Sequence, residues 1–182
     1  VKGKDISVSE EEVEDAIKIA ETGVNAIGFI FYPESKRYIS PKKAKMIIDN
    51  FPPFITTVGV FVNEKWENII DIMKECPIDI LQLHGDESPY YCGQINKRVI
   101  KSFRVGDNFS PNIMSNYRVS AFLLDSFMQG TYGGTGRTFD WDKAIEAKKY
   151  GKIILSGGLN PENVYNAITK VNPYGIDVSS GV

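Results

Sequence analysis

Seven short apolar runs constrain the fold of this chain more than any other feature. They are almost continuously apolar, as strands buried on both faces of a parallel sheet are, and they do not alternate apolar with polar residues. The runs are Ala26–Phe31, Thr57–Val62, Ile80–Leu83, Val99–Phe103, Ala121–Leu124, Ile153–Leu155 and Gly175–Val178. We interpret each of them as a buried β-strand.

Helical patterns lie between these runs. In four of them apolar residues recur at i, i+3, i+4 and i+7, the spacing of a helix with one buried face. These patterns start at Val13, Ala44, Trp66 and Val164. A capping box at Ser9 precedes the first pattern, and Pro41 is a typical first-turn residue of the second. The stretches 104–120 and 137–150 have weaker patterns, which fit short helices or loops.

The alternation of strands with helices predicts a parallel sheet with crossover connections. Polar or glycine residues follow at least five of the runs, whereas an open doubly wound sheet normally binds its ligand at one switch point. In a barrel the C-terminal ends of all strands meet at one mouth, where substrates bind. We therefore predict an α/β fold, a (β/α)8 TIM barrel, formed by residues 1–182 as a single domain. An open doubly wound sheet is the alternative.

Two parts of such a barrel are poorly represented in the sequence. Only Val1-Lys2 is available for the eighth strand, and no helical pattern follows Val178. The chain has 182 residues, and a barrel of this type typically has about 250. We therefore expect a barrel with a poorly represented first strand and without its last helix, which makes it C-terminally incomplete.

Composition argues against several functional classes. A formal net charge of −2 leaves no basic surface for nucleic acid, and no apolar run approaches the roughly 20 residues of a membrane span. The two cysteines and the single histidine lack metal-ligand spacing, so we expect no metal and a reduced, cytoplasmic enzyme. The expected partner is a small molecule, with no nucleic acid and no membrane, and the chain is expected to be a monomer or a homodimer.

A carboxylate at the mouth end of a strand is the first candidate for chemistry. Asp125 directly follows Phe122-Leu123-Leu124, and the glycine loop Gly133-Gly134-Thr135-Gly136 begins a few residues later. A partly desolvated carboxylic acid at this place suits general acid catalysis. The alternative is a capping or loop hydrogen bond. The glycine loop is interpreted as a mobile loop over the mouth, or as a long connection.

Four further polar side chains follow other strands: Arg37, Gln82, His84 and Asp177. The guanidinium of Arg37 could pair with a carboxylate, or it could be a solvated loop residue. Gln82 and His84 alternate with two leucines, so their side chains share one face of the strand. His84 is interpreted as a hydrogen-bonded residue somewhat more readily than as an acid or base, and Asp177 as a site residue or a loop anchor.

Glycine pairs in two loops predict a phosphate site. Gly157-Gly158 and Ser180-Gly181 follow the last two apolar runs. Glycines let backbone N–H groups approach a phosphate closely, and the N-terminus of a following helix adds favourable potential. In barrels, phosphate sites are frequent after strands 7 and 8, so we expect both pairs to bind the same phosphate.

Taken together, these segments resemble the phosphoribosylanthranilate isomerase family of tryptophan biosynthesis over nearly the whole chain. The matching stretches, read from the sequence, are Ile27–Phe31 with Ser35–Tyr38, Val58–Asn63, Gln82–Glu87, Leu124-Asp125, Gly133–Gly136 with Phe139–Trp141, Ser156–Asn163 and Gly175–Val182. The resemblance implies an aldose–ketose isomerase that needs no cofactor and no metal. Its substrate would be a phosphosugar, N-(5-phosphoribosyl)anthranilate, converted by an Amadori rearrangement.

The resemblance also implies roles for the candidates named above. Asp125 would be the general acid, and Arg37 would hold the anthranilate part of the substrate. Gln82, His84 and Asp177 would line the site. Gly157, Gly158, Ser180 and Gly181 would bind the phosphate.

The general base of the resembled family is a cysteine in a Lys-Ile-Cys-Gly motif, and this chain has Val1-Lys2-Gly3-Lys4 instead. Lys2 and Gly3 fit the flanks of that motif, so the intervening residues are either deleted or missing from the sequence as printed. We favour missing residues, because a strand of two residues cannot help to close a barrel. Two other functions stay open: a catalytically silent phosphosugar-binding barrel, and another phosphosugar isomerase or epimerase.

Overall fold

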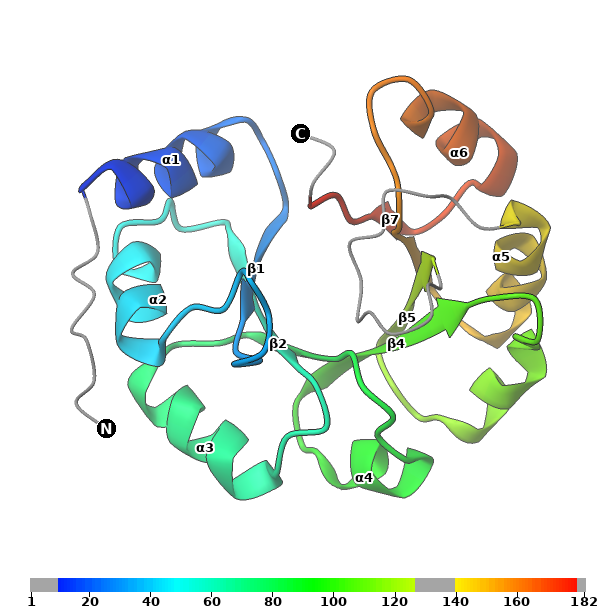
Figure 1. Ribbon diagram of the computed structural model, residues 1–182, viewed down its shortest axis with the longest axis horizontal. Helices are drawn as coiled ribbons and strands as arrows, with labels where there is room; N and C mark the ends of the chain where they lie inside the picture. Colours follow the sequence, from blue (N-terminus) through cyan, green and yellow to red (C-terminus); the bar gives the residue numbers. More distant parts are fainter. Residues whose placement is uncertain (1–9, 127–139, 180–182) are drawn as a thin grey trace. The chain divides into compact units, whose positions relative to one another are not determined.

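A computed structural model describes residues 10–126 and 140–179 of the chain (Figure 1). The chain divides into two compact units, residues 1–81 and residues 82–182. The described residues contain seven strands, β1 to β7. The strand pairs β1–β2, β4–β5, β5–β6 and β6–β7 are all parallel, as the continuous apolar runs predicted.

The strands coincide with the predicted runs to within two residues at either end. They are β1 (Ala26–Ile30), β2 (Thr56–Phe61), β3 (Ile80–Leu83), β4 (Arg98–Val105), β5 (Ala121–Ser126), β6 (Ile153–Leu155) and β7 (Gly175–Ile176). The candidate eighth strand at Val1-Lys2 and the capping residue Ser9 lie outside the described residues.

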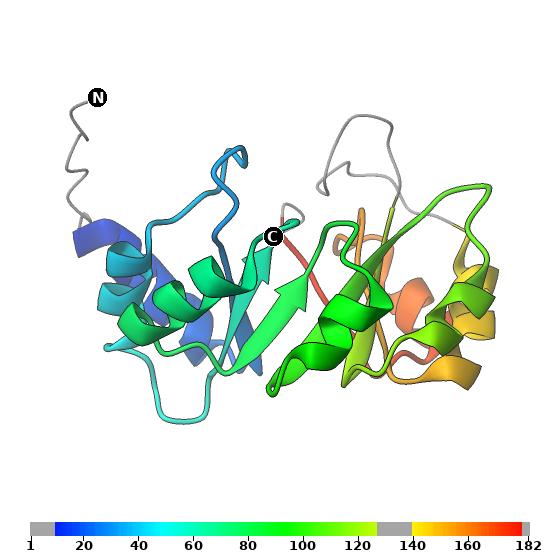
Figure 2. The ribbon, with the colours of Figure 1, turned by 90° about the horizontal axis from the view of Figure 1, so that it is seen from below.

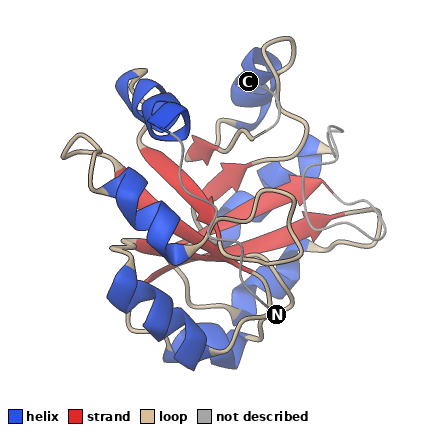
Figure 3. Cartoon of the chain, turned by 60° about the vertical axis from the view of Figure 1, so that its left-hand side comes forward, coloured by secondary structure: helices blue, strands red, loops and turns tan. Residues whose placement is uncertain are grey.

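The helices, blue in Figure 3, alternate along the chain with the strands, which are drawn in red. They are α1 (Glu10–Glu21), α2 (Pro41–Ile48), α3 (Trp66–Glu75), α4 (Pro89–Gln94), α5 (Trp141–Ala147) and α6 (Val164–Val171), with short 3-10 helices η1 (Pro111–Asn116) and η2 (Lys148–Tyr150). The two weakly patterned stretches therefore contain short helices. No helix among these is both long enough and apolar enough to cross a membrane.

The first turn of α2 forms as the sequence predicted. The Ser40 hydroxyl accepts a hydrogen bond from the backbone N–H of Lys43, and Pro41 follows the cap. Ser88 and Pro89 begin α4 in the same way, with Ser88 accepting from the N–H of Tyr91. In both helices an otherwise unpaired N–H group is satisfied by the cap, and the proline removes another.

In the first unit, α1, α2 and α3 pack beside one another in chain order (Figure 2). The rings of Phe31 and Phe61 stack in the core with centroids 5.4 Å apart. β1 and β2 pair from Ala26 with Thr56 to Ile30 with Val60. This core supports the loop between β1 and α2, which carries Arg37.

In the second unit, one face of the sheet packs against α5, α6 and η1. The buried cluster there contains strand residues Val105, Phe122, Leu124 and Leu155, and helix residues including Ala144, Ala167 and Val171. Because successive strand side chains point to opposite faces, the residues next to these point away from the helices. At the C-terminal ends of the strands, that opposite face is polar.

Candidate active site

Four polar residues form a row across the C-terminal ends of β4 to β7. Arg104 is paired in register with Asp125. The pairing of Leu124 with Leu155 puts Ser156 next to Asp125, and the pairing of Leu155 with Ile176 puts Asp177 next to Ser156. The ladder continues to this level, since the N–H groups of Ser156 and Asp177 donate to carbonyl oxygens of the neighbouring strands at 2.9 Å. The row lies on the face away from α5 and α6.

The carboxylate of Asp125 is buried within this row. Asp125 is only 3 % exposed, and its Oδ1 has no hydrogen-bond partner among the described residues. A buried acceptor without a partner costs free energy, so proteins rarely keep one unless it serves a ligand or a reaction. The arrangement leaves one carboxylate oxygen with an unused hydrogen-bond acceptor.

His84 approaches the other oxygen of the same carboxylate. Its Nε2 lies 3.3 Å from Asp125 Oδ2, close enough for an ion pair if the ring is protonated, but not aligned as a hydrogen bond. The amide nitrogen of Gln82 lies 3.0 Å from Nδ1 of His84. When that amide donates to Nδ1, the ring proton is on Nε2, on the side of Asp125. Gln82 and His84 thus share one face, as the alternation predicted.

The loop after β6 brings the first glycine pair to the same carboxylate. Gly157 and Gly158 have φ angles of 82° and 67°, a region that non-glycine residues rarely adopt. A β-carbon on Gly157 would lie 2.6 Å from Asp125 Oδ1 and would also clash with the Ser126 nitrogen. The side-chain amide of Asn163 donates to the carbonyl of Gly158 at 2.8 Å and braces this loop.

Asp177 is anchored in the row. Its Oδ2 accepts a hydrogen bond of 3.0 Å from the Ser156 hydroxyl. The hydrogen bond orients the Asp177 carboxylate, and Asp177 is still partly accessible. This position is compatible with both interpretations of Asp177, as a site residue and as a loop anchor.

The remaining predicted site residues belong to the first unit or lie outside the described residues. Arg37 belongs to the first unit, where it is exposed in the loop after β1, and its backbone N–H donates to Ser35 Oγ at 3.2 Å. The second phosphate pair, Ser180-Gly181, and the glycine loop Gly133-Gly134-Thr135-Gly136 lie outside the described residues.

Two charged residues next to this site were not identified from the sequence. Lys101 is 2 % exposed within β4, and it forms an ion pair of 2.9 Å with Glu87 beneath the loop that carries His84. A lysine inside an otherwise apolar strand is the signal that could have identified it, because charged side chains are almost never fully buried unless they are paired. Arg104 was also missed, and it binds Asp86 of the same loop at 2.6 Å.

Both cysteines are packing residues in this structure. Cys76 and Cys92 are buried and free. Burial raises the pKa of each thiol to about 11, so neither is a thiolate near neutral pH. Among the residues described, no cluster of three or more histidine, cysteine and acidic side chains could hold a metal ion.

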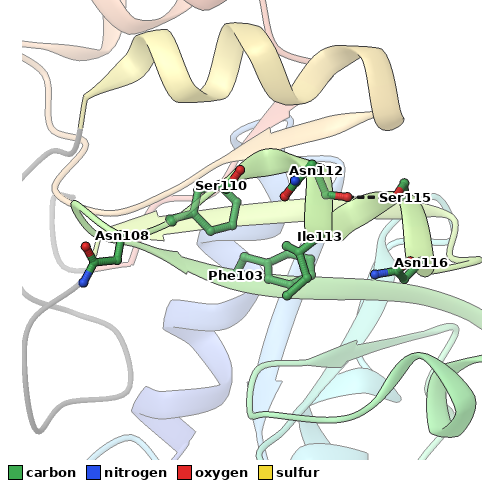
Figure 4. Close-up of a pocket in the computed structure, with 8 residues that line it drawn as sticks. Phe103, Asn108, Ser110, Asn112, Ile113, Ser115 and Asn116 are labelled. Atoms are coloured by element: carbon green, nitrogen blue, oxygen red, sulfur yellow. Dashed lines mark hydrogen bonds between the residues drawn. The ribbon is translucent and has the colours of Figure 1, made fainter.

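A hollow of about 590 Å³ lies elsewhere in the second unit (Figure 4). It is lined by Phe103, Phe109 and Ile113 together with five serine and asparagine side chains. Ser115 donates to the carbonyl of Asn112 at its edge. None of these side chains titrates near neutral pH, so this hollow offers no acid or base.

Comparison with known proteins identifies the family. The family model described as N-(5'-phosphoribosyl)anthranilate (PRA) isomerase matches residues 7–182. The chain belongs to the PRA isomerase family. A PRA isomerase of Geotalea uraniireducens is 52 % identical over 170 residues, which are 93 % of this chain and 84 % of that protein.

Solved PRA isomerases share the fold. The crystal structure from Thermotoga maritima is 45 % identical, with a TM-score of 0.84, and the match covers 93 % of this chain and 84 % of that one. A second structure, 42 % identical with a TM-score of 0.80 and coverage of 93 % and 83 %, contains reduced 1-(o-carboxyphenylamino)-1-deoxyribulose 5-phosphate. The predicted fold class, an α/β fold of the TIM-barrel type, is confirmed by these likenesses.

Proposed function

We propose that this chain is a PRA isomerase that uses Asp125 as its general acid. The observation that carries the proposal is the buried Oδ1 of Asp125, which has no partner among the described residues and lies against the glycine loop after β6. An acid must lie within hydrogen-bond distance of its target. This oxygen is held in place by its strand, and no partner among the described residues occupies it.

The proposed reaction needs one acid and one base, and no oxidant. Asp125 donates a proton to the ribose ring oxygen while the C1′–O bond breaks, and the anthranilate nitrogen supplies its electron pair to form a C1′=N imine. A base then removes the proton on C2′, and those electrons form the C1′=C2′ bond of an enolamine. Tautomerisation of the enolamine gives the ketose, 1-(2-carboxyphenylamino)-1-deoxyribulose 5-phosphate.

The other residues would bind and orient the substrate. The N–H groups of Gly157 and Gly158 would hold the phosphate, joined by Ser180 and Gly181 as the sequence predicts. Gln82, His84 and Asp177 would line the sugar, and Arg37 would pair with the anthranilate carboxylate, which its planar guanidinium suits. The hydrogen bond of 3.0 Å from Ser156 would hold the Asp177 carboxylate in place.

The base is the part of the mechanism that the printed chain lacks. The resembled family implies a cysteine between Lys2 and Gly3, and the raised pKa values of Cys76 and Cys92, about 11 each, disqualify both as substitutes. A cysteine added between Lys2 and Gly3 would supply the base. A monomeric or homodimeric state and a cytoplasmic location stay predictions.

Calorimetric titration with reduced 1-(o-carboxyphenylamino)-1-deoxyribulose 5-phosphate tests the substrate class, because binding requires neither the acid nor the base to act. We expect one molecule bound per chain, displaced by excess inorganic phosphate. Ribulose 5-phosphate, which lacks the anthranilate group, should bind more weakly. Equal affinity for the two compounds would instead favour another phosphosugar isomerase, and binding of neither would contradict the proposal.

A further inference from the structure

The ammonium group of Lys101 is aimed at the turn that carries His84. It donates to the carbonyl oxygens of Leu83 at 3.2 Å and Gly85 at 2.8 Å, to the carbonyl of Ser102 at 3.0 Å, and to Glu87 Oε2 at 2.9 Å. Two of these partners are therefore the residues on either side of His84.

Glu87 completes the clamp from the other end of the turn. Its carboxylate oxygens accept from the N–H of Gly85 at 3.2 and 3.0 Å. Its own carbonyl accepts from the hydroxyl of Tyr117 at 3.1 Å. Lys101 thus holds the peptide group before His84 through its carbonyl, and Glu87 holds the peptide group after His84 through its N–H. The backbone dihedral angles of His84 lie between these two fixed planes.

We propose that the buried Lys101–Glu87 ion pair is a positioning device for His84. The side chains of the pair are 2 % and 3 % exposed, on the helix-facing side of the sheet, whereas His84 points to the opposite face, toward Asp125. The pair therefore acts on the site through the backbone. It sets the direction of the imidazole, and the contact between Gln82 and Nδ1 then sets which ring nitrogen carries the proton.

A purely structural role is the competing explanation, and energetics favours positioning. Two buried charges lose their hydration, and replacing such a pair with apolar residues is often neutral for stability or better. Five hydrogen bonds from the pair instead converge on Leu83 and Gly85 or join the two charges, which is more than packing requires. The pair therefore fixes the backbone geometry of the turn that carries His84.

The chain has a single histidine, so nuclear magnetic resonance of the imidazole nitrogens observes His84 alone. The paired substitution Lys101→Met with Glu87→Met removes both charges and leaves neither unpaired. Lys148→Met is the matched control, because Lys148 also caps a carbonyl, that of Val171 at 2.9 Å, at the end of α6. If the paired variant does not fold, Glu87→Gln gives the same readout with a smaller change in shape.

We expect wild type and Lys148→Met to show the nitrogen shifts of one tautomer, with the proton on Nε2. The paired variant should show shifts averaged between the two tautomers, together with a loss of affinity for the reduced product analogue. In a His84→Ala background, the paired substitution should cause no further loss of affinity. This last expectation rests on the proposed function, whereas the tautomer does not.

Unchanged nitrogen shifts in the paired variant, with a lower melting temperature as the sole effect, would overturn the inference and leave the pair a structural element. The inference would also be overturned if the paired substitution weakens analogue binding equally with and without His84. If wild type itself does not bind the analogue, the proposed function fails, and the nitrogen shifts still decide whether the pair positions His84.

Discussion

A β-carbon on Gly157 would lie 2.6 Å from Oδ1 of Asp125. The loop expected to hold phosphate and the carboxylate expected to act as acid are therefore in direct contact. The two groups are distant in the sequence but close in space, because β5 and β6 are parallel neighbours whose C-terminal ends adjoin. One end of the substrate and its reacting centre can thus be fixed by two touching groups.

This contact predicts a sharp effect of Gly157→Ala. The φ angle of 82° is unfavourable for alanine, by roughly 1–2 kcal/mol, and the new methyl group would displace the Asp125 carboxylate. We expect a lower unfolding free energy by chemical denaturation and weaker binding of the reduced product analogue by calorimetry.

Gly93→Ala is the matched control for that substitution. Gly93 lies in α4, and a β-carbon there would meet nothing within 4 Å. Alanine in a helix is favoured over glycine by roughly 1 kcal/mol, so this variant should be at least as stable as wild type and bind normally. Unchanged binding by Gly157→Ala would contradict the contact.

The fold could be predicted from the sequence because its signals are local. Runs such as Ile80–Leu83 and Ile153–Leu155 coincide with β3 and β6, since a strand buried on both faces needs a continuous apolar segment. The stretch 104–120 was ambiguous because η1 is a short 3-10 helix, too short for a full amphipathic period.

The site was only partly predictable, because its charges act between strands. Asp125, Gln82 and His84 could be predicted to lie together because each lies at or next to the C-terminal end of a strand. Lys101 was not, because its role depends on carbonyl oxygens 16 and 18 residues away, of Gly85 and Leu83. No local pattern encodes a partner of that kind. The bracing of Gly158 by Asn163, five residues along the same loop, was also not predicted.

Arg37→Ala should weaken binding of the reduced product analogue without changing stability. Arg37 is exposed, so its loss leaves no cavity, whereas a hydrogen bond to a charged group contributes roughly 1.5–3 kcal/mol. That range corresponds to a dissociation constant about 10- to 150-fold higher. Affinity for inorganic phosphate should not change, because phosphate has no anthranilate carboxylate.

The neighbouring exposed residue supplies the control, since Lys36→Ala removes one positive charge from the same loop. It should leave the affinity for the analogue near that of wild type. Equal losses in both variants would mean that the loop contributes general charge, and would remove the specific role of Arg37.

The buried thiols predict a loss of stability in alkali. Burial raises the pKa values of Cys76 and Cys92 from 9.0 to about 11. As the pH rises from 9 to 11, thiols of the unfolded chain release protons that those of the folded chain retain, and this favours unfolding. The stability that the protonated buried thiols contribute is fully present below pH 9 and is lost as the pH rises from 9 through 11.

Urea denaturation of wild type and of the variant Cys76→Ala with Cys92→Ala, below and above pH 9, measures this effect. The variant should lose less stability than wild type over that interval, because lysines and tyrosines titrate in both proteins. Parallel losses would show that the thiols are accessible. Native wild type should also resist alkylation at neutral pH, and rapid labelling of either cysteine would contradict its burial.

The most direct measurement is turnover of N-(5-phosphoribosyl)anthranilate by three proteins: the printed chain, confirmed by its mass of 20.4 kDa, the chain with isoleucine and cysteine inserted between Lys2 and Gly3, and Asp125→Asn in that longer chain. We predict slow turnover by the first, efficient turnover by the second, and a loss of about 10²–10⁴-fold in the third, with analogue binding retained in all three. Efficient turnover by the printed chain would refute the cysteine base. Undiminished turnover by Asp125→Asn would contradict the central claim that Asp125 is the acid.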